Sequence, residues 1–367
     1  MTRRLTTLSA ALVLAATTAA PAQVITTFAG TGEHAFSPDG SPAATSPIAL
    51  AINNVSNVVP DSDGNLTFAE GRVCRIRRIM RKTGLLETLA GNGRCSYSGD
   101  GGPATAASLK DPAEVAYDRN DNLFIADAGN NVIRRVDRKT GTITTVAGNR
   151  IPKWDGDGVA IEKGLARPSG ITFDREGRLL ISDTASARIR RLDLKTGLLT
   201  TIAGMDALDY VGGRARETGI GWPNALRFDP KGALFIVATG NHLILRLDPK
   251  QEYFSVAAGD GRYGEEGDGG PAVKARLNQP ASLAVDGAGN VFICDTQNDA
   301  IRRVDAKTGI ITHVAGAHKE GFSGDGGPAA DAALWVPLGI GLDGKGNLYV
   351  VDAGNGRIRK IAGVAAR

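Results

Sequence analysis

The sequence predicts an all-β protein, a six-bladed β-propeller, from two observations. The stretch from Asp118 to Asp137 recurs in six copies, and the copies start 55 to 57 residues apart. Such regular repetition is typical of propellers and other repeat arrays. Each copy also carries short apolar runs separated by turn residues, which suit the four antiparallel strands of one blade. The other copies start at Asp61, Asp174, Asp229, Asp286 and Asp343.

The copy at Asp118 shows the elements of one blade in order. Its opening Asp and Asn residues predict a tight turn, because Asn tolerates positive φ and Asp bonds its own backbone. Two short strands follow at residues 123–126 and 132–136, and a second turn leads to a strand at 142–148. The segment before the copy, residues 114–117, supplies the innermost strand.

The two ends of the chain complete one blade between them. The sixth copy reaches Ile361 and stops without its outer strand, whose pattern reappears at residues 24–30. We expect this N-terminal segment to pair as the outer strand of the last blade. That pairing closes the ring and covers an edge that would otherwise favour aggregation.

Residues 1–22 have the pattern of a secretory signal peptide. Two arginines precede an apolar run at residues 8–16 that is too short to span a bilayer, and residues 20–22 fit a cleavage motif. An uncleaved membrane anchor is the alternative. We therefore expect one propeller domain over residues 23–367, secreted or periplasmic, without a membrane span.

Charge argues against binding to nucleic acid. Two of the 43 basic residues fall in the expected signal peptide, so the rest of the chain has 41 basic and 39 acidic residues. A balance so close to neutral creates no field that would attract nucleic acid or an acidic membrane over a distance. We expect a monomer.

The three cysteines predict one disulfide. By register, Cys74 ends the loop between two strands, and Cys95 lies in the long loop that leaves the same blade, so both belong to one face. An exported protein meets an oxidising environment. We predict a Cys74–Cys95 bond, with two free thiols as the alternative. Cys294 lies inside an apolar strand, where we expect a small buried thiol.

A second repeated segment lies between the blades. Its Gly-Asp-Gly-Gly-Pro-Ala core predicts a glycine turn and one or two helical turns that start at Pro, on the face that carries Cys74 and Cys95. The aspartates of these insertions suit the caps of the short helices. Calcium binding is the alternative, because Ca²⁺ takes several oxygen ligands at one point. The candidates are Asp100, Asp157, Asp268 and Asp325.

The repeats and insertions together resemble a known family. Residues 122–137 and 347–361 are similar to NHL repeats, and with the insertions they resemble the long-loop NHL propellers of secreted bacterial proteins and of the teneurin ectodomain. The resemblance covers residues 24–363 and implies an interaction platform more often than a catalyst. The copy at Asp229 departs from it, because Ala238 stands where the other copies have Asp or Glu.

We interpret features that recur from blade to blade as scaffold. Arginine pairs such as Arg134-Arg135 recur on the third strand, beside recurring aspartates. RNA binding, known for some intracellular NHL domains, is the alternative. Export and the near-neutral charge instead favour pairing of these arginines with carboxylates.

A metal-dependent lyase or hydrolase with a site at the channel mouth is the second functional hypothesis. Among the positions that should line the channel, Glu114 is the only carboxylate, and Arg227 is a cation. His34 and His318 lie in long loops that the ring should bring together, so they are a conceivable metal pair. A catalytic zinc or calcium ion needs at least three convergent ligands, and the sequence does not show such a set.

Aromatic residues in the loops of the insertion-bearing face are the candidate ligand contacts. Exposed Trp and Tyr are enriched at binding hot spots because they combine a large apolar area with a polar group. For Trp222 and Trp335, next to inner-strand prolines, we favour packing on their own blades. We expect a binding module without a cofactor or a catalytic role, whose partner is a protein or a cell-surface glycan. The other aromatic candidates are Trp154, Tyr210, Tyr97, Tyr263 and Phe322.

Overall fold

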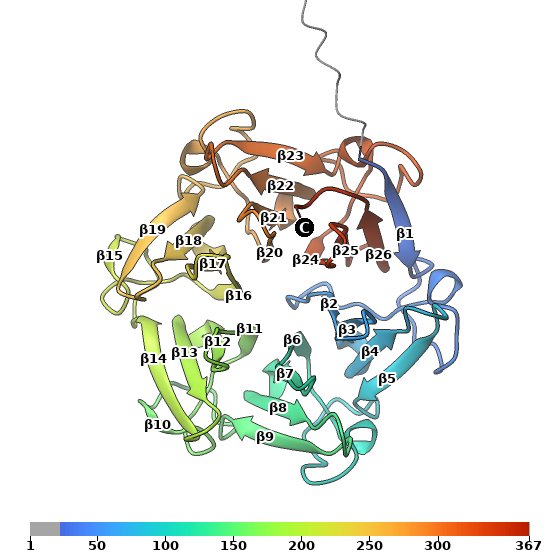
Figure 1. Ribbon diagram of the computed structural model, residues 1–367, viewed down its shortest axis with the longest axis vertical. Helices are drawn as coiled ribbons and strands as arrows, with labels where there is room; N and C mark the ends of the chain where they lie inside the picture. Colours follow the sequence, from blue (N-terminus) through green and yellow to red (C-terminus); the bar gives the residue numbers. More distant parts are fainter. Residues whose placement is uncertain (1–22, 367) are drawn as a thin grey trace, which may run out of the picture.

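A computed structural model describes residues 23–366, which form six antiparallel sheets arranged in a ring (Figure 1). The fold is therefore the predicted six-bladed β-propeller. The expected signal peptide, residues 1–22, lies outside the described residues. Within residues 23–366, no helix combines the length and the apolar character that crossing a bilayer requires.

The first three blades follow one another along the chain, each from an inner to an outer strand. Blade 1 consists of β2 (Val59–Pro60), β3 (Leu66–Glu70), β4 (Arg75–Ile79) and β5 (Leu86–Ala90). Blade 2 consists of β6 (Pro112–Tyr117), β7 (Leu123–Asp127), β8 (Val132–Val136) and β9 (Ile143–Ala147). Blade 3 consists of β11 (Pro168–Phe173), β12 (Leu179–Asp183), β13 (Arg188–Asp193) and β14 (Leu198–Gly204), with the short β10 (Gly158–Val159) at its outer edge.

The second half of the ring repeats this order. Blade 4 consists of β16 (Pro223–Phe228), β17 (Leu234–Ala238), β18 (Leu243–Leu247) and β19 (Tyr253–Ala258), with β15 (Gly213–Arg214) outside it. Blade 5 consists of β20 (Ser282–Val285), β21 (Val291–Asp295), β22 (Ala300–Val304) and β23 (Ile311–Ala315). Blade 6 consists of β24 (Pro337–Leu342), β25 (Leu348–Asp352), β26 (Arg357–Ile361) and, from the other end of the chain, β1 (Ile25–Ala29).

The ring closes through the N-terminal strand, as predicted. β1 pairs antiparallel with β26, with Ile25 opposite Ile361 and Thr26 opposite Lys360, and the two strands lie side by side in Figure 1. The apolar core is divided into clusters that each combine side chains of two neighbouring blades. One of these clusters contains Ile25 together with buried residues of blades 5 and 6. Closure of the ring and packing of the core therefore depend on the same strand.

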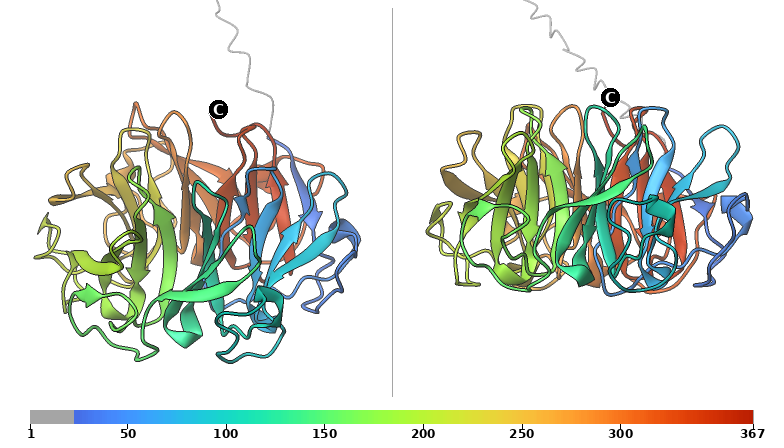
Figure 2. Two further views of the ribbon diagram at one scale, coloured as in Figure 1. Left: turned by 60° about the horizontal axis from the view of Figure 1, so that its bottom comes forward. Right: turned by 90° about the horizontal axis from the view of Figure 1, so that it is seen from below.

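The connections between strands lie on two faces, seen at the two edges of the side view in Figure 2. The face that carries the long segments between blades, together with the turns between second and third strands, is called the insertion face. The face that carries the remaining turns is called the opposite face. Short 3-10 turns occur in the insertions, at η1 (Ala43–Thr45), η3 (Ala104–Ala106), η7 (Ala272–Lys274) and η9 (Ala329–Asp331). Others follow the second strands, at η2 (Gly71–Val73), η4 (Ala128–Asn130), η5 (Thr184–Ser186), η6 (Thr239–Asn241) and η8 (Thr296–Asn298).

The predicted disulfide between Cys74 and Cys95 is confirmed, with the two Cα atoms 5.4 Å apart. It joins the turn after β3 to the insertion that follows β5. Cys294 is a buried free thiol, as expected.

Reduction of this disulfide should lower the free energy of unfolding by about 3 kcal/mol, because the bond closes a loop over a sequence separation of 21 residues and restricts the unfolded chain. Urea unfolding with and without dithiothreitol measures the effect. The variant Cys74→Ala/Cys95→Ala is the control and should not respond to the reductant. Equal stability of the oxidised and reduced wild-type protein would contradict the prediction.

Candidate functional site

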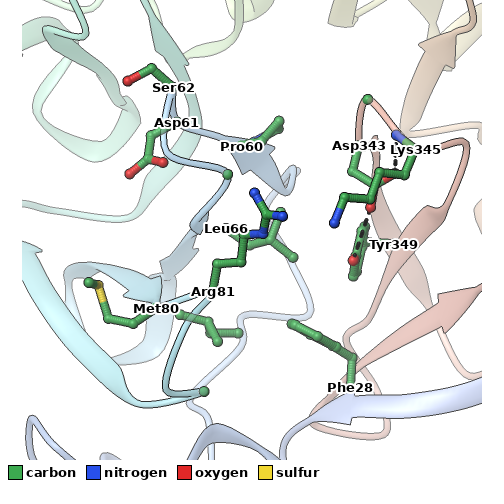
Figure 3. A pocket seen from close by; sticks show the side chains of 14 residues that line it. Phe28, Pro60, Asp61, Ser62, Leu66, Met80, Arg81, Asp343, Lys345 and Tyr349 are labelled. Carbon is green, nitrogen blue, oxygen red and sulfur yellow. Dashed lines mark hydrogen bonds between the residues drawn. The ribbon is translucent and has the colours of Figure 1, made fainter. Parts of the chain in front are cut away.

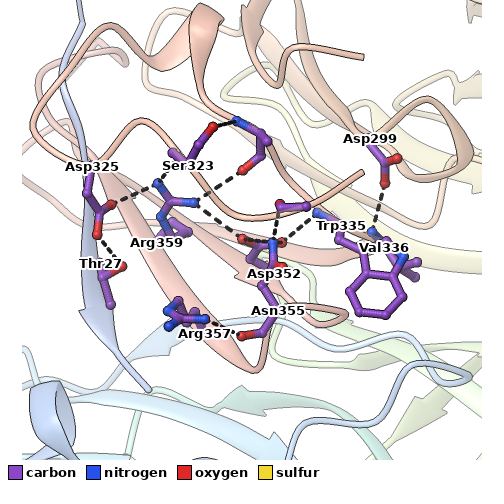
Figure 4. Close-up of polar contacts among 12 residues, drawn as sticks. Thr27, Asp299, Ser323, Asp325, Trp335, Val336, Asp352, Asn355, Arg357 and Arg359 are labelled. Carbon is purple, nitrogen blue, oxygen red and sulfur yellow. Dashed lines mark hydrogen bonds and ion pairs between the residues drawn. The ribbon is translucent and has the colours of Figure 1, made fainter. Parts of the chain in front are cut away.

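A buried ion-pair network links the insertions to the blades. In blade 6, the fully buried Arg359 lies 3.4 Å from Asp352 at the end of β25 and 2.8 Å from Asp325 of the insertion (Figure 4). Thr27 of β1 donates its hydroxyl to the same Asp325 carboxylate at 2.6 Å. The predicted pairing of third-strand arginines with carboxylates is therefore confirmed. Equivalent fully buried arginines are Arg77, Arg134, Arg190 and Arg302.

The insertion aspartates do not cap the 3-10 turns, so that prediction is wrong. In the part of the chain that the structure describes, η3, η7 and η9 have a proline at the N-cap position and no side-chain capping bond. Asp100, Asp268 and Asp325 instead lie 2.7 to 3.0 Å from buried arginines, and Asp157 accepts a hydrogen bond from Thr201. A buried guanidinium requires a charged partner, whereas one exposed helical turn does not. The carboxylates considered for calcium thus already serve the network.

Three of the aromatic candidates belong to the repeated scaffold. Each stands three residues before an insertion aspartate, and an arginine of the third strand lies over its ring. The residue at this position is Phe, Tyr or Trp in different insertions, so the recurrence of an aromatic ring was not recognised from the sequence. The guanidinium to ring-centroid distances are 4.9 Å for Arg134 and Tyr97, 4.1 Å for Arg188 and Trp154, 3.7 Å for Arg357 and Phe322, and 4.1 Å for Arg75 and Phe36.

The other aromatic candidates differ in exposure. Trp222 and Trp335 are 52% and 41% exposed, so the packing expected for them is only partial. The ring of Trp335 lies so close to Gly354 that a side chain at that glycine would collide with it. Tyr263 is 74% exposed, whereas Tyr210 is half-buried against the core of blade 4.

Glu114 and Arg227 bind each other in the channel. They project from the inner strands β6 and β16, and both guanidinium to carboxylate distances, Nη1–Oε2 and Nη2–Oε1, are 3.0 Å. Glu114 is fully buried and also accepts a hydrogen bond from the backbone N–H of Ile171. Burial raises the pKa of Glu114, and the Arg227 guanidinium opposes that rise. The bidentate pair occupies both side chains, so it favours a structural role for them.

The two loop histidines have different partners. His34 Nε2 lies 3.3 Å from the carbonyl oxygen of Gly354, whereas His318 Nδ1 lies 3.4 Å from Glu265. His318 lies beside His313 of β23, with the ring centroids 4.9 Å apart. The residues considered for catalysis thus form separate contacts instead of one constellation.

Blade 4 replaces the polar network with apolar side chains. Ala238 takes the place of the second-strand carboxylate, Leu245 that of the buried arginine, and Val256 that of the threonine. Ala238 and Leu245 are fully buried. The carboxylate and the arginine are replaced together because loss of only one member of a buried ion pair leaves an uncompensated charge, whereas loss of both members is well tolerated.

A groove on the opposite face was not predicted from the sequence. It lies between blades 6 and 1 and has a volume of about 520 Å³ (Figure 3). Phe28 and Tyr349 line it, with ring centroids 5.1 Å apart, together with Arg81 of blade 1 and Lys345 of blade 6. These residues meet only because the ring closes. Grooves of about 560 and 370 Å³ at two other blade junctions indicate that such hollows belong to the scaffold.

Comparison with known proteins finds several relatives. The family model of the Teneurin NHL domain matches residues 259–323. Protein SUPPRESSOR OF QUENCHING 1 of Arabidopsis thaliana is 29% identical over 295 residues, which cover 76% of this chain and 27% of that protein. Teneurin-1 of Mus musculus is 29% identical over 230 residues (56% of this chain, 8% of that protein). NHL repeat-containing protein 2 of Bos taurus is 29% identical over 281 residues (68% and 38%). The chain thus spans 8 to 38% of the length of these relatives.

Solved structures share the fold. An auxiliary nutrient binding protein from Bacteroides thetaiotaomicron superimposes with a TM-score of 0.68 at 19% identity, covering 93% of this chain and 76% of that chain. Virginiamycin B lyase from Staphylococcus aureus superimposes with a TM-score of 0.51 at 12% identity, covering 86% and 97%. One of these structures is named for binding and the other for catalysis, so the shared fold does not decide the function.

Proposed function

We propose that this chain, which is an NHL-repeat β-propeller, is a binding module whose partner docks on the insertion face around Trp222 and Trp335. The main support is that these two residues are 52% and 41% exposed close to the starts of the inner strands β16 and β24. Exposed tryptophans on a rigid scaffold supply a large contact area at a small cost in conformational entropy. NHL domains generally mediate protein interactions.

The partner that we favour is a protein located outside the cytoplasm. A cell-surface glycan is the alternative partner, and the fluorescence screen below can identify either. The Cys74–Cys95 disulfide supports this location, because such bonds persist in oxidising compartments. The signal-peptide pattern of residues 1–22 supports it independently.

The tryptophans themselves report on binding. The sequence contains three, Trp154, Trp222 and Trp335, and all three are 40% to 52% exposed in segments of the insertion face. A partner that docks there should shift their fluorescence emission to shorter wavelength and protect them from acrylamide. Envelope proteins and surface glycans of the source organism can be screened by this signal.

Substitution of the two rim tryptophans should then weaken binding of the identified partner. We expect Trp222→Ala/Trp335→Ala to reduce affinity roughly 30-fold, the equivalent of about 2 kcal/mol for a hot spot. The control Arg81→Ala/Lys345→Ala changes the groove of the opposite face and should leave affinity unchanged. The reverse pattern would place the site in the groove and contradict the proposal.

A further inference from the structure

Blade 5 departs from the repeated network at two positions around the insertion aspartate. In blades 1, 2, 3 and 6 of the described ring, a threonine of the outer strand bonds this aspartate, as Thr27 bonds Asp325. The same position of β23 holds His313. Three residues before the aspartate, where four other insertions have an aromatic ring, the insertion of blade 5 has Glu265. The threonines are Thr27, Thr88, Thr145 and Thr201.

A second histidine reaches the same place from the next insertion. The ring of His318 lies 4.9 Å from that of His313, and its Nδ1 lies 3.4 Å from the Glu265 carboxylate. Ligand atoms of Asp268, His313 and His318 all lie within 4.8 Å of one another. Two insertions and one outer strand thus bring three metal-ligating side chains to a single point, and Glu265 lies beside His318.

Asp268 and His313 each have an atom that is free to bind a metal ion. The hydrogen bonds from Arg302 to Asp268 go to Oδ1, at 3.1 and 3.0 Å, and leave Oδ2 for another partner. The Nδ1 atom of His313 is buried and has no hydrogen-bond partner among residues 23–366. Burial also lowers the pKa of His313, which favours the neutral imidazole that binds metals.

We propose that Glu265, Asp268, His313 and His318 bind a single Zn²⁺ ion. Imidazole nitrogen and carboxylate oxygen are both ligands of four-coordinate zinc. Ca²⁺ and Mg²⁺ prefer oxygen ligands throughout, so the two histidines select against them. The ion joins the insertions that precede blades 5 and 6 and stabilises this part of the insertion face by binding only the folded state.

A competing account needs no metal. His313 then takes the place of threonine beside Asp268 with its Nε2 bonded to the carbonyl oxygen of Ala330, and the neighbouring His318 pairs with Glu265 on the surface. This account predicts that added zinc changes neither the stability nor the spectra of the protein, so the two can be separated.

The test uses the folded full chain without a histidine tag, treated with EDTA and then dialysed. Calorimetric titration with ZnCl₂ should give one site per chain with a micromolar or lower Kd, and saturation should raise Tm by roughly 2–5 °C. His318→Ala should weaken zinc binding at least about tenfold. This variant leaves the Arg302–Asp268 ion pair intact, so it should still fold. CaCl₂ and MgCl₂ should not bind at this site.

The control is His242→Asn, on the same face but outside the cluster. His242 has a φ of 56°, a conformation that asparagine tolerates, and we expect unchanged zinc affinity. Loading with Co²⁺ should give the visible absorption of a tetrahedral site in the wild type and not in His318→Ala. Zinc binding no tighter than millimolar, or equal loss of affinity in both variants, would overturn the proposal.

Discussion

Arg134→Leu should destabilise the protein by about 3–5 kcal/mol, although it places an apolar side chain in the interior. Arg134 is fully buried, and its guanidinium lies 3.4 Å from Asp127 and 2.7 Å from Asp100. Asp100 is partly exposed and can bind water, but the Asp127 side chain is fully buried. Removal of the arginine therefore leaves a carboxylate in the core without its cation, which is costly. Urea unfolding at neutral pH measures the change in the free energy of unfolding.

Arg135→Leu is the matched control for this prediction. Arg135 pairs with Asp137 at 3.0 Å, and both side chains are about one-third exposed. A pair of that kind contributes less than about 1 kcal/mol. If the free energy of unfolding falls equally in Arg134→Leu and Arg135→Leu, burial of the Arg134–Asp127 pair does not explain the effect.

A second variant tests the physical cause. Asp127→Ala/Arg134→Leu copies the arrangement that blade 4 already has at Ala238 and Leu245. No buried charge is then left unpaired, because the remaining partner, Asp100, is partly exposed to water, so the double variant should recover at least half of the stability lost in Arg134→Leu. With the single variant Asp127→Ala and the wild type, these two variants form a thermodynamic cycle that isolates the interaction between the two side chains.

The sequence was sufficient to predict the ring because each blade repeats the same turns at the same offsets. The incomplete copy that ends at Ile361 and the matching segment at residues 24–30 also predicted how β1 closes it. The Cys74–Cys95 bond followed from register together with the oxidising environment expected for an exported protein. In each of these cases the register of the repeats places the relevant residues on a known strand or face, so their spatial relation can be inferred without coordinates.

The contacts on the insertion face could not be predicted in the same way. Phe36 and Tyr97 look unrelated in the sequence, and their equivalence becomes visible only when each ring is seen against an arginine. Glu265 and His313 likewise stand out only once the usual occupants of their positions are known. Side-chain roles depend on contacts between segments, and a sequence pattern does not fix those contacts.

Ring closure gives the second large effect that we expect. Ile25 of β1 is fully buried in the cluster shared by blades 5 and 6 and pairs with Ile361 of β26. Ile25→Asp would place a carboxylate among apolar side chains, and we expect a loss of about 4 kcal/mol or more. Because β1 covers the edge of β26, its release should also expose a strand that favours association. Urea unfolding and size-exclusion chromatography measure the two consequences.

Thr26→Asp distinguishes closure from a general effect of charge in this strand. Thr26 is exposed and lies opposite Lys360, so a carboxylate there stays in water beside a cation, and the change in stability should remain within about 0.5 kcal/mol. Hydrogen exchange at the β26 amides should accelerate in Ile25→Asp and stay slow in Thr26→Asp. If both variants unfold at the wild-type urea concentration, β1 does not hold the ring closed. If only Ile25→Asp unfolds early and the β26 amides exchange first, the N-terminal strand is the point from which the propeller opens.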